Sequence, residues 1–78
     1  MRLKDMREDG DIKQDILAEY LNVAQNTYSQ YENGKRQLPL GALIKLARYF
    51  NTSTDYILEL TDDPRPYPPS TRKKIENA

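Results

Sequence analysis

Hydrophobic residues recur every three or four positions along the first sixty residues, the spacing of one face of an α-helix. Leu3 and Met6 predict a first short helix that stops at Gly10, where we expect the left-handed conformation. A second helix, over about residues 13–20 and ended by Asn22, is predicted from the spacing of Ile16, Leu17, Ala18 and Leu21. The pattern therefore favours helices and no sheet.

Three further helices follow, each separated from the next by a turn residue. Asn22 predicts a tight turn, because asparagine tolerates the left-handed conformation, before a third helix over 24–32 that ends at Asn33 and Gly34. A fourth helix is predicted from Leu43, Leu46, Ala47 and Phe50. Ser53 is a suitable N-cap for a fifth helix that we expect to run through Leu60.

Four prolines in the segment 62–69 exclude a helix there and favour an extended backbone. The segment 70–78 adds basic residues and is too short to fold alone. We therefore expect one helical domain over 1–61 and a flexible, proline-rich, basic tail over 62–78.

Composition removes several classes of function. The 78 residues contain no Cys and no His, which excludes thiolate or imidazole metal sites and the usual nucleophiles and bases. We predict no enzyme activity, cofactor, metal or small-molecule substrate, since so small a helical domain offers little concave surface. No apolar run is long enough to span a bilayer and no signal peptide is evident, so we expect a cytoplasmic protein.

Charge is balanced overall but uneven along the chain. Twelve Lys and Arg residues offset twelve Asp and Glu residues, which argues against binding through bulk positive charge. Lys35 and Arg36 directly follow the third helix. The acidic residues of the first part are Asp5, Glu8, Asp9, Asp11, Asp15 and Glu19. We expect an acidic back, which is a solvated surface, and a mildly basic front.

The third helix has one face that is polar but uncharged. Tyr28 and Tyr31 share one side of this helix, and the opposite side, here called the polar face, consists of Gln25, Asn26, Ser29 and Gln30. A glutamine or asparagine amide carries a donor and an acceptor together, so it can pair with the N6 and N7 atoms of adenine in the major groove. The polar face is therefore suited to reading base edges.

These features together resemble the lambda-repressor/Cro-type helix-turn-helix, the XRE family. The similarity covers about residues 2–60, and its most specific element is the string Tyr-Glu-Asn-Gly-Lys-Arg at 31–36, which begins seventeen positions after Gln14. It implies an all-α, five-helix, lambda-repressor-like domain whose second and third helices form the helix-turn-helix. The third helix would enter the major groove of double-stranded DNA and the second would cross the backbone.

The resemblance also implies roles for individual residues. Gln25, Asn26 and Gln30 would reach bases, whereas Ser29 and Thr27 could contact either a base or a phosphate. The residues expected to contact phosphates are Lys13, Gln14, Asn33, Lys35 and Arg36, with Thr27 among them under the second alternative.

Arg7 matches the family's first-helix arginine, which implies a buried structural ion pair with Glu32. Lys13 and Ala24 stand where relatives have Ser or Thr caps, so both caps should be weak. Tyr28 occupies a core position, and we expect its hydroxyl to emerge near a phosphate.

The expected function is sequence-specific transcriptional regulation, in this family most often repression, by a homodimer on an inverted repeat. Tyr56 and Leu60 are the candidates for the dimer contact. The alternative is an antitoxin-type or other protein-binding module that uses the acidic helices or the proline-rich tail. The sequence does not reveal the operator, the regulated genes or any inducer.

Overall fold

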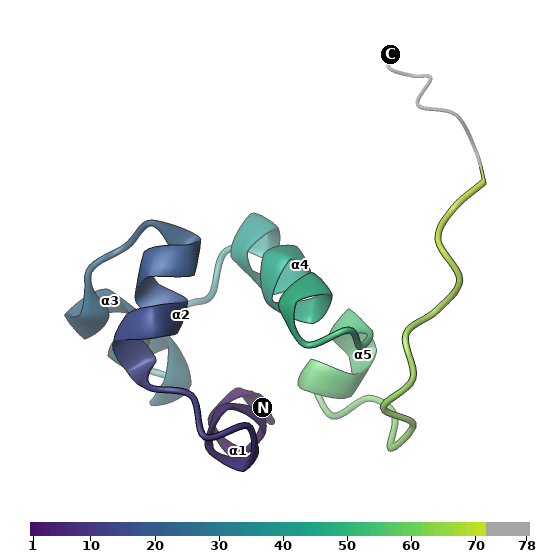
Figure 1. The fold of residues 1–78 in the computed structure, drawn as a ribbon, viewed down its shortest axis with the longest axis horizontal. Helices are drawn as coiled ribbons and strands as arrows, with labels where there is room; N and C mark the ends of the chain where they lie inside the picture. The colour runs from purple at the N-terminus through teal and green to yellow at the C-terminus, as the bar shows by residue number, and fades with distance from the viewer. Residues whose placement is uncertain (72–78) are drawn as a thin grey trace.

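The computed structural model describes residues 1–71, which form five α-helices and no strand. The helices are α1 (Leu3–Asp9), α2 (Gln14–Leu21), α3 (Gln25–Glu32), α4 (Leu40–Tyr49) and α5 (Thr54–Ile57). Figure 1 shows α2 and α3 grouped at one end of the molecule, with α4 and α5 toward the other. The predicted all-α class, with five helices, is therefore confirmed.

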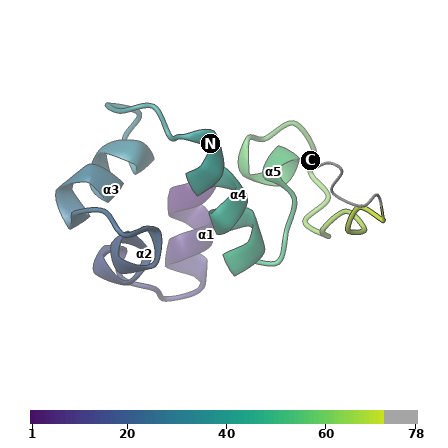
Figure 2. The ribbon, with the colours of Figure 1, turned by 90° about the horizontal axis from the view of Figure 1, so that it is seen from above.

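Every helix contributes one large side chain that is fully buried. These side chains are Leu3, Leu17, Tyr28, Leu46 and Ile57. They meet in one core together with Ala18, Leu21, Tyr31, Leu43 and Ala47. Viewed from above, α1 and α4 lie in the middle of the molecule, between the α2 and α3 pair and α5 (Figure 2). A core shared in this way fixes the position of α3 relative to all the other helices.

Three of the predicted turn devices are present in the structure. Asn22 ends α2 in the left-handed conformation with φ 60°, and Asn51 takes the same conformation, with φ 54°, after α4. Gly34 has φ 74° just beyond α3. Ser53 caps α5, because its Oγ accepts a hydrogen bond of 3.0 Å from the backbone N–H of Tyr56. These residues separate four of the helices at the expected places.

The expectation for Gly10 was wrong, because its φ is −86° and it is Asp11 that is left-handed, with φ 57°. The backbone N–H of Ile12 donates to the carbonyl of Arg7 at 3.0 Å, which closes the helix end one residue later than expected. A Cβ at Gly10 would lie 3.1 Å from Cδ1 of Ile12. Glycine is therefore required here for the close approach of Ile12, and not for its backbone conformation.

The fifth helix is shorter than expected and does not run through Leu60. It ends at Ile57, and the chain turns at Glu59, which has φ 66°. The backbone N–H of Arg2 takes the carbonyl of Ile57 at 2.8 Å, and Nε of Arg2 takes the carbonyl of Tyr56, also at 2.8 Å. These carbonyls would accept bonds from a continuing helix, so the N-terminal segment ends α5.

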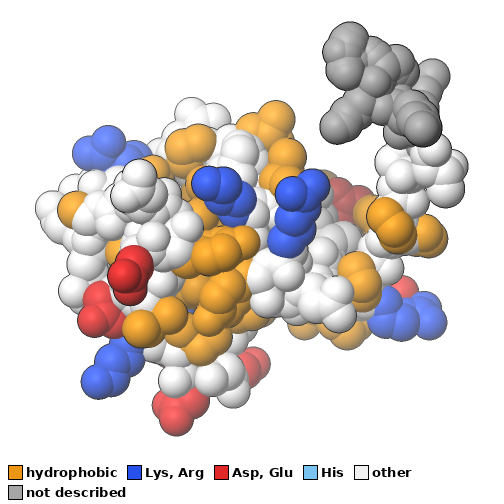
Figure 3. Space-filling view, turned by 45° about the horizontal axis from the view of Figure 1, so that its top comes forward, with side chains coloured by type: hydrophobic (Ala, Val, Ile, Leu, Met, Phe, Trp, Pro, Cys, Tyr) orange, Lys and Arg blue, Asp and Glu red, His pale blue; other side chains and the backbone are white. Residues whose placement is uncertain are grey.

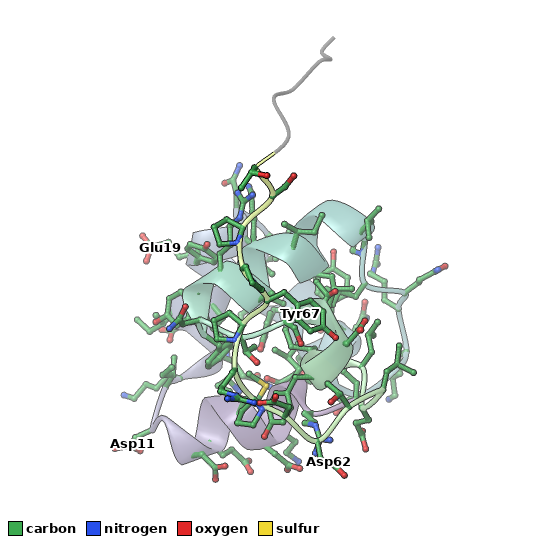
Figure 4. All side chains as sticks on the ribbon, turned by 90° about the vertical axis from the view of Figure 1, so that its right-hand side faces the viewer. Asp11, Glu19, Asp62 and Tyr67 are labelled. Atoms are coloured by element: carbon green, nitrogen blue, oxygen red, sulfur yellow. The ribbon has the colours of Figure 1, made fainter. Side chains whose placement is uncertain are left out.

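The proline-rich segment contacts the helices through residues 61–67, which are not helical. Thr52 Oγ1 donates to the carbonyl of Pro64 at 2.6 Å, and the Tyr67 hydroxyl donates to Asp55 Oδ2 at 2.8 Å. Arg2 donates to Asp62 at 2.9 Å. Figure 4 shows the segment crossing in front of the helices, with Asp62 and Tyr67 labelled. The tail expected over 62–78 therefore has anchored positions, and its residues 72–78 lie outside those described.

In the described part of the chain, no helix has the length and apolar character that crossing a membrane requires.

Candidate nucleic-acid interface

The polar face of α3 is directed away from the core. Tyr28 and Tyr31 are buried on the inner side of the helix, with 0% and 6% of their surface exposed. Gln25 and Asn26 are exposed, whereas Ser29 and Gln30 are half-buried. Because residues three and four apart lie on one face of a helix, burial of the two tyrosines turns the amides outward. No side chain of this face carries a charge.

The turn between α2 and α3 holds these two helices in a fixed orientation. The backbone N–H groups of Asn22 and Val23 donate at 3.0 Å to the carbonyls of Glu19 and Ala18, which satisfies the end of α2. Ala24 begins α3 from an extended backbone without a side-chain cap, and Lys13 does the same for α2. The weak caps that the sequence predicted are therefore present. Packing between α2 and α3, and not capping, stabilises this pair.

A buried ion pair attaches the end of α3 to α1. Arg7 Nε lies 2.6 Å from Glu32 Oε2, and a second guanidinium nitrogen donates to Oε1 at 3.1 Å. The side chains of Arg7 and Glu32 are 12% and 1% exposed. Arg7 also donates to the carbonyl of Ile12 at 2.9 Å. This two-pronged geometry is the strong form of an arginine–carboxylate contact, and it fixes the rotation of α3.

Gln14 is the third member of this cluster. Its Nε2 donates to Glu32 Oε1 at 3.0 Å, so the first residue of α2 lies beside the last residue of α3. The sequence gave no signal for this bond, because the role expected for Gln14 was a phosphate contact. The Gln14 side chain is half-buried, while its neighbour Lys13 is exposed.

The expectation that the Tyr28 hydroxyl emerges at the surface was wrong. This oxygen is buried beside Arg7 and Glu32 and has no hydrogen bond of good geometry to a described residue. Burial, followed by the nearby Glu32 carboxylate, raises the pKa of Tyr28 above its ordinary value. Tyr28 therefore belongs wholly to the core and cannot contact a phosphate.

Glu32 is held in its charged form. Burial alone would raise the pKa of Glu32, but hydrogen bonds from Arg7 and Gln14 and the neighbouring Tyr28 hydroxyl outweigh this effect. The pKa of Glu32 therefore lies below its ordinary value of 4.5. A carboxylate with a lowered pKa stabilises the fold above the ordinary value and loses that contribution as the pH falls through its folded-state pKa.

We accordingly expect the free energy of unfolding to fall below about pH 4.5 more steeply in the native protein than in Glu32→Gln. Urea unfolding of both proteins between pH 3 and pH 6 measures this difference. Glu32→Gln should be less stable at pH 6, and the gap should narrow as the pH falls. A gap that stays constant over this range would show that Glu32 does not titrate as described.

The loop after α3 folds back toward the helix. Gly34 turns the chain, and the backbone N–H groups of Lys35 and Arg36 donate to the Gln30 carbonyl at 2.9 and 3.3 Å. Asn33 Nδ2 lies 3.5 Å from Ser29 Oγ, and Arg36 Nε donates to Gln30 Oε1 at 2.9 Å. Lys35 and Arg36 are exposed. The loop thus places two basic residues directly beside the polar face.

The structure brings most of the predicted site residues together. Those on α3 are Gln25, Asn26, Ser29 and Gln30, with Thr27 half-buried among them. Lys13 and Gln14 lie at the start of α2, next to the end of α3, and Asn33, Lys35 and Arg36 complete the loop. Sequence reasoning missed the bond between Arg36 and Gln30, because only the backbone geometry after Gly34 shows that the arginine returns.

The remaining surface differs from this region in character. The six acidic residues of α1, α2 and the connecting turn are all exposed. Hydrophobic side chains gather in the middle of the face shown in Figure 3. Tyr20 and Tyr49, both partly exposed, pack edge to face with ring centroids 5.0 Å apart and join α2 to α4. Ile16 was part of the predicted apolar pattern, but it is 47% exposed.

Two helices joined by a left-handed turn, the second with an outward polar face, define a helix-turn-helix DNA-binding domain. A family model described as helix-turn-helix matches residues 3–57. The chain belongs to this family, the XRE-type helix-turn-helix domains, as the resemblance predicted. No solved structure gives a significant match to the chain.

Three similar proteins are bacterial or phage regulators. The chain is 42% identical to the uncharacterized HTH-type transcriptional regulator YobD of Bacillus subtilis over 83% of its own length and 58% of YobD. It is 40% identical to the HTH-type transcriptional regulator ImmR of the same organism over 73% of its length and 45% of ImmR. It is 32% identical to the cryptic phage CTXphi transcriptional repressor RstR of Vibrio cholerae over 80% and 53%. The chain spans about half the length of these curated relatives.

Proposed function

We propose that this chain is the operator-binding part of a transcriptional repressor that binds an inverted repeat as a dimer. The observation that carries the proposal is the uncharged polar face of α3, held outward by buried Tyr28, Tyr31 and Glu32. RstR, whose printed name is that of a repressor, supports the direction of regulation. Such a regulator would act in the cytoplasm, where bacterial DNA lies.

The proposed contacts divide by chemistry. Gln25, Asn26 and Gln30 reach base edges in the major groove, and Ser29 lies beside them. The residues proposed to contact phosphates are Lys13, Gln14, Thr27, Asn33, Lys35 and Arg36. Gln14 offers a phosphate its backbone N–H at the start of α2, while its side-chain amide binds Glu32.

Dimerisation follows from the size of the site, because one recognition helix contacts only a few base pairs. Two copies would place their α3 helices on half-sites about 34 Å apart. Leu58 and Leu60, which are 42% and 72% exposed, offer apolar surface for this contact. Tyr56, the other expected contact, is half-buried, with the Arg2 guanidinium 4.3 Å from its ring centre. We therefore place the contact on the leucines.

In-vitro selection from random duplexes tests the proposal directly. We expect an inverted repeat whose half-sites are separated by about one helical turn. Sedimentation of the protein with and without the selected duplex would measure a stoichiometry of two chains per duplex. Recovery of no motif would reject sequence-specific binding.

Salt dependence tests the phosphate contacts. Lys35→Ala and Lys13→Ala should each weaken binding to every sequence alike and flatten the dependence of affinity on salt by roughly 0.9 log units per decade. Lys4→Ala is the control, since Lys4 lies exposed on α1, outside the proposed interface. Fluorescence anisotropy at several salt concentrations gives the slopes. A slope unchanged in both variants would remove these lysines from the interface, and salt-insensitive binding to another protein would favour the protein-binding alternative.

A further inference from the structure

The Arg36 side chain is held by the helix that it follows. Its Nε donates to Gln30 Oε1 at 2.9 Å, and the Gln30 backbone carbonyl accepts from the backbone N–H groups of Lys35 and Arg36. Gly34, with φ 74°, allows the chain to turn back in this way. Arg36 and Gln30 are thus joined through both the backbone and the side chains, and each limits the rotamers that the other can adopt.

This bond changes what Gln30 offers to a base. A glutamine amide has one oxygen that accepts hydrogen bonds and one NH₂ group that donates two. The guanidinium occupies the oxygen of Gln30 and leaves the NH₂ group for an outside partner. The remaining N–H groups of Arg36 also only donate. The pair therefore presents donors, whereas a free glutamine presents a donor and an acceptor together.

Base edges in the major groove distinguish these two cases. A free glutamine matches adenine, because adenine offers the N7 acceptor and the N6 donor. Guanine offers two acceptors, N7 and O6, on the same edge. We propose that Gln30 and Arg36 form one reading unit that selects guanine, with Arg36 a positioning residue that sets specificity through Gln30. The inference rests on the proposed function, because it assumes that α3 enters the major groove.

The test is in-vitro selection from random duplexes with the native protein, Gln30→Ala, Arg36→Ala and Lys35→Ala. The position that loses its base preference in Gln30→Ala identifies the base that faces Gln30. We expect guanine there for the native protein and a shift of about tenfold toward adenine in Arg36→Ala, because Oε1 becomes free. Lys35→Ala is the matched control. It removes one charge from the same loop, but no hydrogen bond joins the Lys35 and Gln30 side chains, so guanine should be retained.

The possible results separate this inference from the proposed function. If the native protein recovers no motif, the proposed function fails and the inference fails with it. If a motif is recovered, the inference alone is overturned by adenine at the Gln30 position of the native protein. It is also overturned by a Gln30→Ala motif identical to the native one, or by an Arg36→Ala motif that keeps guanine and loses only overall affinity. Circular dichroism melting of each variant checks that its fold is intact.

Discussion

Arg7→Ala should lower the free energy of unfolding by about 3–5 kcal/mol, because it leaves the Glu32 carboxylate buried without its partner. Glu32 is 1% exposed, so water cannot replace the two hydrogen bonds that the guanidinium supplies. The hydrogen bond from Arg7 to the carbonyl of Ile12 is lost as well. Denaturant unfolding followed by circular dichroism measures the change. A loss below about 1 kcal/mol, the range of surface ion pairs, would contradict this account.

Two further variants make this measurement specific. Arg65→Ala removes an arginine from an ion pair with Asp63 that lies at the surface, and it should leave stability unchanged. The double variant Arg7→Met with Glu32→Met should be more stable than Arg7→Ala, because no unpaired charge remains buried. A double variant that is less stable than Arg7→Ala would indicate that packing, and not the buried charge, dominates.

Gln25→Ala should weaken binding to the selected operator by about 1–3 kcal/mol per half-site, or about 5- to 150-fold. Gln25 is the first residue of α3, and its exposed amide has no hydrogen bond to the other described residues. Its donor and acceptor are therefore both free for a base. Titration against operators that differ at one position should place the loss at a single base pair of each half-site, with binding to random duplex unchanged.

Asn51→Gly serves as the control for this prediction. Asn51 has φ 54°, a conformation that glycine adopts without strain, so the exchange removes an exposed amide without disturbing the turn. It lies in the turn between α4 and α5, which Figure 1 shows well away from α3. Its affinity for the operator should equal that of the native protein. If Gln25→Ala also matches the native protein on every operator, Gln25 reads no base.

Local features of the sequence were sufficient to predict much of the fold. Asn22, Gly34 and Ser53 have turn or capping chemistry that acts within a few residues, and the structure has each of them in that role. The spacing of Tyr28 and Tyr31 was enough to predict which side of α3 faces the core. These properties depend on neighbours three or four positions away, which a sequence displays directly.

Features that depend on distant residues could not be predicted. The end of α5 is set by Arg2, more than fifty positions earlier in the chain, so Leu60 was wrongly placed in a helix. Gly10 was expected to be left-handed, but it is small to accommodate Ile12. The bond of Gln14 to Glu32 and that of Arg36 to Gln30 depend on how side chains meet after folding.

Tyr28, Tyr31 and Glu32 anchor α3 from its inner side, while Gln25 and Asn26 make no part of that anchor. Mutations at the two outer positions can therefore accumulate without a penalty in folding. A lineage of such domains could move from one operator to another by successive single exchanges, each tolerated by the scaffold. The same separation makes this helix a convenient template for engineered repressors with altered targets.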